Sequence, residues 1–385
     1  YAQKVEEGKA IRLSTREVPL GKIHPGIVSL VVSPDGKHVA YMARKELLGK
    51  KWLVVVDGKE GKEYDWISRL TFSSDSKHFA YLARRGNKWL VVVDGKEYDE
   101  IKEYSLIFSP DGKRFAYVAR RGKKELVVVD GEEGKEYDEV WGLTFSPDSK
   151  HLAYAGWRGK KCFLIVDGEE CKEYDLITTL AFSPDSKHLA YVAWRGGKLL
   201  VVVDGKEGKE YDLIEISRLI FSPDSKRLAY RARRGTKKLV VVDGEEGKEY
   251  DEIEEGSLTF SPDSRRLAYV AKRGDKWLVV VDGEEGKEYD WIEKGSLIFS
   301  PDSKRLAYVA KRGEKNLKEL VVVDGEEGKE YDEIEEGSLI FSPDGKHFAY
   351  LVRRGIKWFA VVDGEEGKEY DEIEEGSLIF SPDGK

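Results

Sequence analysis

The chain has few of the residue types that carry redox chemistry or that degrade at high temperature. Cys162 and Cys171 are its two cysteines, and only one methionine occurs among 385 residues. Gln3 is the only glutamine, and Asn87 and Asn316 are the only asparagines. This scarcity, combined with many lysines and glutamates, resembles the composition of proteins from hot environments. It concerns stability and not function.

The two cysteines lie in the same part of the chain, with Cys162 expected at the start of a strand and Cys171 in the hairpin loop beyond its far end. A strand rises about 3.3 Å per residue, which separates them by about 15 Å. That distance is beyond the reach of a disulfide. We therefore expect free thiols, which carry no information about the redox compartment.

Long apolar runs are also missing. No segment approaches membrane-spanning length, and no secretory signal is visible. The net charge of −8 argues against a nucleic-acid partner, which requires a basic surface. Hydrophobic residues make up 40% of the chain, enough for a folded core although 36% of residues are charged.

What the chain has in abundance is an internal repeat of about 39 residues, and such a repeat indicates one continuous structure whatever the length. Its anchor is Ser-Pro-Asp-Gly or Ser-Pro-Asp-Ser, and Ser73-Ser74-Asp75-Ser76 is a variant. The anchors recur every 36 to 42 residues and begin at Ser33, Ser109, Ser146, Ser183, Ser222, Ser261, Ser300, Ser342 and Ser381.

The unit from Gly256 to Lys294 shows how each repeat is expected to fold. Turn residues separate four short segments of strand-forming residues, which predicts a four-stranded antiparallel meander. The expected strands are residues 257–260, 266–271, 277–281 and 288–292.

The second and third strands of each unit are apolar at nearly every position, so both faces of the small sheet need covering. Identical sheets stacked face to face supply that cover. An open stack leaves two apolar ends exposed, whereas a ring leaves none. The pattern therefore predicts an all-β fold: one domain over residues 1–385, a closed β-propeller of four-stranded antiparallel blades.

The two ends of the chain complement one another. The chain stops after a first strand and its turn, and Tyr1–Gly8 aligns with Phe348–Gly355 of a second strand. We infer that residues 1–26 supply the last three strands of a composite blade whose first strand comes from residues 376–385. With nine continuous blades over residues 27–375 this gives ten blades. Nine blades with loose ends is the alternative.

The string Phe-Ser-Pro-Asp-Gly-Lys-His-Phe-Ala-Tyr at Phe341–Tyr350 resembles the WD40-like PD40 repeat of TolB-type propellers, and the likeness recurs over essentially the whole chain. The resemblance implies the propeller fold and makes an exported or periplasmic location possible. It implies little about function, because such propellers serve as protein-binding modules, scaffolds and gating domains. The late units are nearly identical, which indicates recent amplification or deliberate design, and the irregular early units favour amplification.

The charged residues that recur in every unit suggest a structural role rather than a catalytic or metal-binding one. Five histidines follow the anchor turn where other units carry arginine, which favours a solvated charge over a metal ligand. Paired acids such as Glu254-Glu255 are expected to form surface ion pairs with cations such as Lys272-Arg273. The histidines are His38, His78, His151, His188 and His347. No catalytic or phosphate-binding motif occurs, and we expect no enzyme activity, cofactor or metal.

The best functional signal is departure from the repeat. Trp157 and Trp194 replace the usual cation in the turn between second and third strands of two consecutive units. Trp141, Thr178 and Thr179 replace the acids in the neighbouring loops, and the first unit inserts Leu47 and Leu48. Exposed aromatic residues where sister units are charged suggest a contact patch, although drift of older units is the alternative.

The resulting hypothesis is a monomeric, non-catalytic binding or scaffold propeller that contacts a protein or a glycan through this loop face. Two rival hypotheses remain open. One is a hydrolase or lyase with a site in the central channel, which needs polar residues unique to one blade near its first strand, and none is evident. The other is an engineered or recently amplified repeat protein without a defined ligand.

Overall fold

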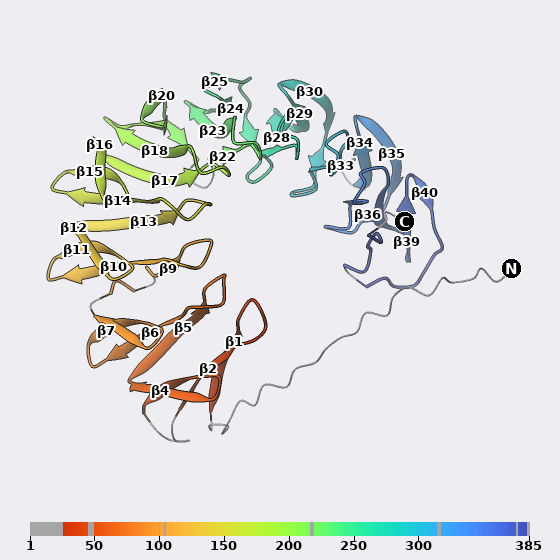
Figure 1. Cartoon of the computed structure of the whole chain (residues 1–385). Coiled ribbons are helices and arrows are strands. Elements are labelled where there is room, and N and C mark those ends of the chain that lie inside the picture. Colours follow the sequence, from red (N-terminus) through yellow and green to blue (C-terminus); the bar gives the residue numbers. More distant parts are fainter. Residues whose placement is uncertain are drawn as a thin grey trace. The chain divides into compact units, whose positions relative to one another are not determined.

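The computed structural model describes residues 26–44, 50–99, 101–103, 105–215, 219–313, 317–374 and 376–382. Over these residues the chain is all-β and forms nine sheets, shown in Figure 1. It divides into two compact units, residues 1–145 and 146–385. No helix among the described residues is long and apolar enough to cross a membrane.

We number the sheets in chain order. The first sheet comprises β1 (Ile27–Val32), β2 (Val39–Arg44), β3 (Trp52–Val56) and β4 (Lys59–Tyr64). The second comprises β5 (Trp66–Phe72), β6 (Phe79–Arg85), β7 (Lys88–Val93) and β8 (Lys96–Asp99). The third comprises β9 (Ile107–Phe108), β10 (Phe115–Arg121), β11 (Lys124–Val129) and β12 (Glu132–Tyr137). The fourth comprises β13 (Glu139–Phe145), β14 (Leu152–Arg158), β15 (Lys161–Val166) and β16 (Glu169–Tyr174). The fifth comprises β17 (Leu176–Phe182), β18 (Leu189–Arg195), β19 (Lys198–Val203) and β20 (Lys206–Tyr211).

The last four sheets have the same meander with a first strand split into two pieces. The sixth comprises β21 (Leu213–Ile214), β22 (Ile220–Phe221), β23 (Leu228–Arg234), β24 (Lys237–Val242) and β25 (Glu245–Glu246). The seventh comprises β26 (Glu252–Ile253), β27 (Thr259–Phe260), β28 (Leu267–Arg273), β29 (Lys276–Val281) and β30 (Glu284–Tyr289). The eighth comprises β31 (Trp291–Ile292), β32 (Ile298–Phe299), β33 (Leu306–Arg312), β34 (Lys318–Val323) and β35 (Glu326–Tyr331). The ninth comprises β36 (Glu333–Ile334), β37 (Ile340–Phe341), β38 (Phe348–Arg354), β39 (Lys357–Val362) and β40 (Glu365–Glu366).

The prediction of four-stranded antiparallel meanders is confirmed, but one strand boundary was wrong. Residues 288–292 were expected to form a fourth strand, whereas that strand is β30 and Trp291–Ile292 opens the next sheet as β31. The reason is the two-residue turn at Asp282-Gly283, whose φ angles of 51° and 85° reverse the chain at once. The fourth strand therefore begins at Glu284 and ends at Tyr289.

A serine holds the split first strand together. In the seventh sheet the Ser257 hydroxyl donates to the Glu254 carbonyl oxygen at 2.9 Å and accepts the Val270 amide at 3.1 Å. The hydroxyl thus replaces the main-chain bonds that the excursion between β26 and β27 would leave unmade. The acids before the glycine therefore lie beside a strand and not in a free loop.

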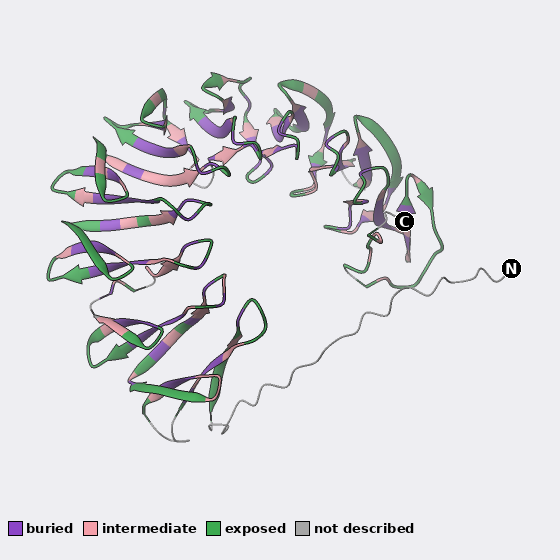
Figure 2. Ribbon diagram, viewed as in Figure 1, coloured by how far each residue is buried: buried purple, intermediate pink, exposed green. Residues whose placement is uncertain are grey.

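The core lies between successive sheets. Ala229 and Val240 of the sixth sheet pack in one cluster with Leu267, Tyr269 and Leu278 of the seventh. In Figure 2 the second and third strands are largely buried, while the fourth strands are largely exposed. Equivalent clusters join the first sheet to the second, the second to the third, and each sheet from the fifth to the eighth to the next, which confirms the predicted face-to-face cover for these pairs.

Tyrosine side chains fasten neighbouring sheets to one another. Tyr250, which bridges to β24, is 1% exposed, and its hydroxyl donates to the Glu285 carboxylate of the seventh sheet at 3.0 Å. Its ring meets Tyr269 edge-on at 6.2 Å, and Arg273 pairs with Glu285 at 3.0 Å. The same tyrosine-to-glutamate bond recurs from Tyr64 to Glu97, Tyr174 to Glu207, Tyr211 to Glu246, Tyr289 to Glu327 and Tyr331 to Glu366.

The composite closing blade remains a prediction. Residues 1–25 and 383–385 lie outside the described residues, and residues 376–382 are described but form no strand. Strand β1 at the start of the described chain exposes apolar side chains: Ile27, Val28, Leu30 and Val32 are 41% to 53% exposed.

Candidate functional site

Four of the tryptophans, Trp52, Trp89, Trp277 and Trp358, share one position near the start of the third strand. In the register where the second strand ends and the third begins, a cation faces a tryptophan across the two strands of several sheets. Arg84 lies over the Trp89 ring at 5.7 Å, and Lys272 lies over Trp277 at 5.4 Å. The pairs Arg44–Trp52 and Arg353–Trp358 repeat the arrangement. Such cation–π pairs place each tryptophan in the scaffold.

The fourth and fifth sheets reverse this pair. Trp157 on β14 faces Cys162, and Trp194 on β18 faces Leu199. The tryptophan has moved to the second strand, and a smaller apolar residue has taken its place on the third. The tryptophan gained on the second strand is therefore accompanied by the loss of the tryptophan on the third strand that several sister sheets have.

The fifth sheet carries no charge across three strands in this register. Leu176 of the first strand faces Trp194, so the row reads Leu176, Trp194, Leu199 and carries no charge. In seven other described sheets, all except the fourth, the corresponding row has at least one charged residue. Trp194 is 44% exposed, which leaves this apolar row open to solvent.

The remaining predicted contact residues lie in strands rather than in loops. Trp141 is in β13 of the first unit, while Thr178 and Thr179 are in β17 of the second. Trp157 and Trp194 precede the two-residue turns instead of forming them, because cross-strand pairing extends β14 and β18 as far as Arg158 and Arg195. The oxygen of Thr178 is buried and has no hydrogen-bond partner among the described residues. Leu47 and Leu48 lie outside the described residues.

Leu199 was missed from the sequence although a signal was present, whereas Leu176 gave no signal, because the sixth unit carries Leu213 at the same position. At the position of Leu199, sister units carry tryptophans such as Trp89 and Trp277. Two further exposed tryptophans, Trp66 at 45% and Trp291 at 41%, face Arg84 and Lys311 respectively.

Both cysteines are unpaired, as predicted, but Cys171 lies within β16 and not in a loop. Cys162 is buried, and burial raises the pKa of its thiol to about 12. Cys171 is exposed.

The histidines form ion-pair positions of the scaffold. His38 Nδ1 lies 2.7 Å from the Asp57 carboxylate, and His188 lies 2.7 Å from Asp204. Where the unit has arginine instead, Arg114 pairs with Asp130 at 3.0 Å. Among the described residues no group of three or more histidine, cysteine or acidic side chains is arranged to hold a metal ion.

Hydrogen bonds account for the serine and the aspartate of the anchor turn. In the fifth sheet the Ser183 hydroxyl donates to Asp185 at 2.7 Å and accepts the His188 amide at 3.0 Å. The pKa of Asp185 is lowered to about 2; the hydrogen bond from Ser183 is the largest cause, and the hydrogen bond from the Lys187 amide is the second largest. The Asp185 amide donates to Ser225 of the next sheet at 2.9 Å, so the turn also joins neighbouring sheets.

The expected pairing of the repeated acids with the cations of the next turn occurs in the eighth sheet, where Lys311 pairs with Glu293 at 2.6 Å, but not at Glu254 of the seventh. Arg273 pairs with Glu285 and Glu288 of its own sheet, and Glu254 is only 8% exposed. Burial raises the pKa of Glu254. The excursion of the first strand turns this acid inward.

One polar residue near the first strand, Arg231, is unique to its unit, contrary to the expectation that none is present. Arg231 replaces the apolar residue (valine, leucine, methionine or alanine) of sister second strands and is 6% exposed. It pairs with Glu215 and donates to the Ile253 carbonyl oxygen at 2.8 Å. Because these partners satisfy it, Arg231 is a buried structural ion pair rather than a free catalytic cation.

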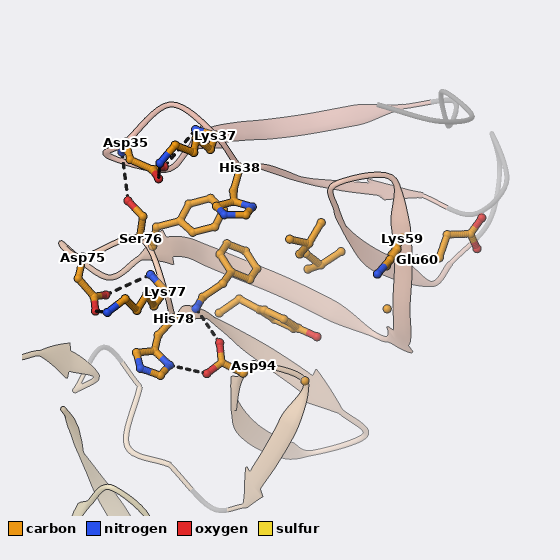
Figure 3. Close-up of a pocket in the computed structure, with 17 residues that line it drawn as sticks. Asp35, Lys37, His38, Lys59, Glu60, Asp75, Ser76, Lys77, His78 and Asp94 are labelled. Atoms are coloured by element: carbon orange, nitrogen blue, oxygen red, sulfur yellow. Dashed lines mark hydrogen bonds and ion pairs between the residues drawn. The ribbon is translucent and has the colours of Figure 1, made fainter. Parts of the chain in front are cut away.

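At the opposite end of the meanders, a cavity of about 630 Å³ opens between the first and second sheets. Figure 3 shows Asp35, Lys37 and His38 of one sheet facing Ser76, Lys77 and His78 of the next. Phe72, Phe79 and Tyr81 form its aromatic wall.

No protein-family model matches the chain, and no curated protein matches it. Among solved structures the chain resembles "the eukaryotic initiation factor", with 15% identity over 83% of this chain and 94% of that one and a TM-score of 0.36. It also resembles the β-propeller domain of the Trilobed protease from Pyrococcus furiosus, with 15% identity, 69% and 97% coverage and a TM-score of 0.34. It also resembles the Dos1 propeller, with 12% identity over 74% of this chain and 90% of that one and a TM-score of 0.34. At these similarities the function of those proteins does not transfer.

Proposed function

We propose that the chain is a non-catalytic binding propeller that contacts a protein or a glycan through the fifth sheet. The observation that carries the proposal is the uncharged row of Leu176, Trp194 and Leu199. Aromatic residues flanked by apolar ones are typical of binding hot spots, and an apolar surface of this kind is costly without a partner.

The proposal includes closure of the sheets into a ring of ten blades, with residues 1–26 and 376–385 sharing the last one. Its support is the alignment of the two termini and the apolar side chains that β1 exposes. The PD40 resemblance supports the same fold.

The test uses two surface variants of the full chain. Trp157→Lys with Trp194→Lys should abolish binding to whichever peptide or glycan an unbiased array identifies, while the melting curve stays unchanged. Trp291→Lys is the matched control, because that ring is equally exposed but already lies beside Lys311. Binding that survives the double substitution would eliminate the patch.

The rival without a ligand predicts that the wild-type array stays blank. The enzymatic rival predicts turnover of glycan or peptide substrates by the purified protein, and loss of that turnover on replacing Arg231. That residue is the polar group unique to one unit, so it is where such an activity would first be sought.

A further inference from the structure

The residue that follows the anchor turn decides how the cleft between successive sheets is filled. Where it is arginine, its guanidinium crosses to the next sheet and lies over a phenylalanine. Arg227 lies 5.3 Å from the Phe260 ring, and its Nη1 donates to the Arg265 carbonyl oxygen at 3.2 Å. Arg266 repeats this with Phe299 and Lys304, and Arg305 with Phe341 and Lys346.

Where the residue is histidine, the shorter side chain stays with its own sheet. His38 is bound to Asp57 at 2.7 Å, and its ring centroid is 6.4 Å from that of Phe72, the equivalent phenylalanine. The acceptor equivalent to the Arg265 carbonyl is that of Lys77. An imidazole cannot both hold Asp57 and reach across to this carbonyl, so the place of the guanidinium is left open.

Cavities lie in the clefts after three of the five histidines. The clefts after His38, His151 and His188 hold cavities of about 630, 350 and 410 Å³. Each is lined by the phenylalanine of the next sheet, namely Phe72, Phe182 and Phe221. After Arg305 there is also a cavity, of about 430 Å³, but neither Arg305 nor Phe341 lines it. The arginine therefore closes the part of the cleft that the histidine leaves accessible.

We propose that the three histidine clefts bind guanidinium groups, supplied by arginine side chains of a partner polypeptide. The chain itself shows the required geometry three times, in Arg227, Arg266 and Arg305. A planar guanidinium can lie on the phenylalanine face while its edge donates to a carbonyl, a combination that a compact ammonium matches less well.

The charge around the first cleft suits a cation. Four acids line the cavity against three lysines, so the lining keeps an excess of one negative charge. The acids are Asp35, Glu60, Asp75 and Asp94, and the lysines are Lys37, Lys59 and Lys77. Lys37 and Lys77 pair with Asp35 and Asp75, and His78 lies 2.6 Å from Asp94. The buried Oδ2 of Asp75 accepts no hydrogen bond from the described residues. The net charge of −8 favours the approach of a basic partner.

The experiment titrates the full chain with arginine ethyl ester and, in parallel, with lysine ethyl ester, followed by calorimetry and by NMR. We expect saturable binding with a roughly 5-fold preference for the arginine ester, in line with cation–π energies at partly desolvated sites. Replacing His38, His151 and His188 together by arginine should fill the clefts, remove the binding and raise the melting temperature.

The reciprocal variant opens a cleft. Arg227→His should add one binding site, whereas Arg234→His removes the same charge at the other end of the second strand and should add none. Cys171 lines the cavity after His151 and is exposed, so its alkylation should slow when the arginine ester is bound.

Equal affinity for both esters, or binding that the triple arginine variant retains, would overturn the proposal. A blank titration of the wild type would do the same. The Trp157→Lys and Trp194→Lys variants alter the opposite end of the sheets and should leave ester binding unchanged, so the result is independent of the function proposed above.

Discussion

The bond between Tyr250 and Glu285 tests whether neighbouring sheets are fastened by tyrosine hydroxyls. Tyr250→Phe removes a donor that lies 3.0 Å from a carboxylate, while the ring contact with Tyr269 is kept. A hydrogen bond to a charged group contributes about 1.5 to 3 kcal/mol. Because Glu285 keeps Arg273 at 3.0 Å and Lys248 at 3.6 Å, we expect the lower end, about 1.5 kcal/mol.

Hydrogen exchange is the suitable assay, since each sheet contacts only its neighbours and the loss should be local. Amides of the sixth and seventh sheets should exchange about tenfold faster in Tyr250→Phe, and those of the second sheet should not change. Adding Glu285→Gln completes a double-mutant cycle, in which most of the effect should appear as coupling. A coupling below about 0.3 kcal/mol, which is within the additivity of independent sites, would refute the fastening role.

Three further predictions concern stability. The hydrogen bond from Arg85 is the main cause that holds the pKa of the Glu97 carboxyl at about 2, below its unfolded value of about 4.3. The ionised Glu97 therefore adds to the free energy of unfolding above about pH 4.3, and this stabilisation is lost as the pH falls towards 2. The melting temperature should therefore fall between about pH 5 and 2, less steeply in Glu97→Gln, and a flat profile would contradict this. Arg231→Val should leave the melting temperature unchanged or raise it. Glu215→Ala leaves the buried Arg231 cation without its carboxylate and should lower the free energy of unfolding by about 3 kcal/mol. A larger loss of stability in Arg231→Val than in Glu215→Ala would be incompatible with a structural ion pair. Deleting residues 1–25 should increase binding of a hydrophobic dye and lower the melting temperature if they help to close the ring, and no change in either would favour open ends.

Much of the candidate site could be foreseen because the repeat makes exceptions visible. Trp157 and Trp194 stand out against the cations of their sister units. Their compensation by Cys162 and Leu199 could not be foreseen, because it depends on which residues face one another across two strands. The same holds for Leu176, which is ordinary in sequence and notable only beside Trp194.

The sequence by itself determined the repeat, the four-stranded meander and the need to cover both faces, since these follow from periodic turn residues and from second and third strands that are apolar throughout. It did not determine where each strand ends, because a two-residue Asp-Gly turn and a serine that bridges a split strand act through geometry. Only the tertiary structure showed that arginine reaches across the cleft towards the next sheet and that cavities lie beside His38, His151 and His188 in the corresponding clefts. That difference depends on the reach of a side chain across a space which exists only once two sheets are packed together.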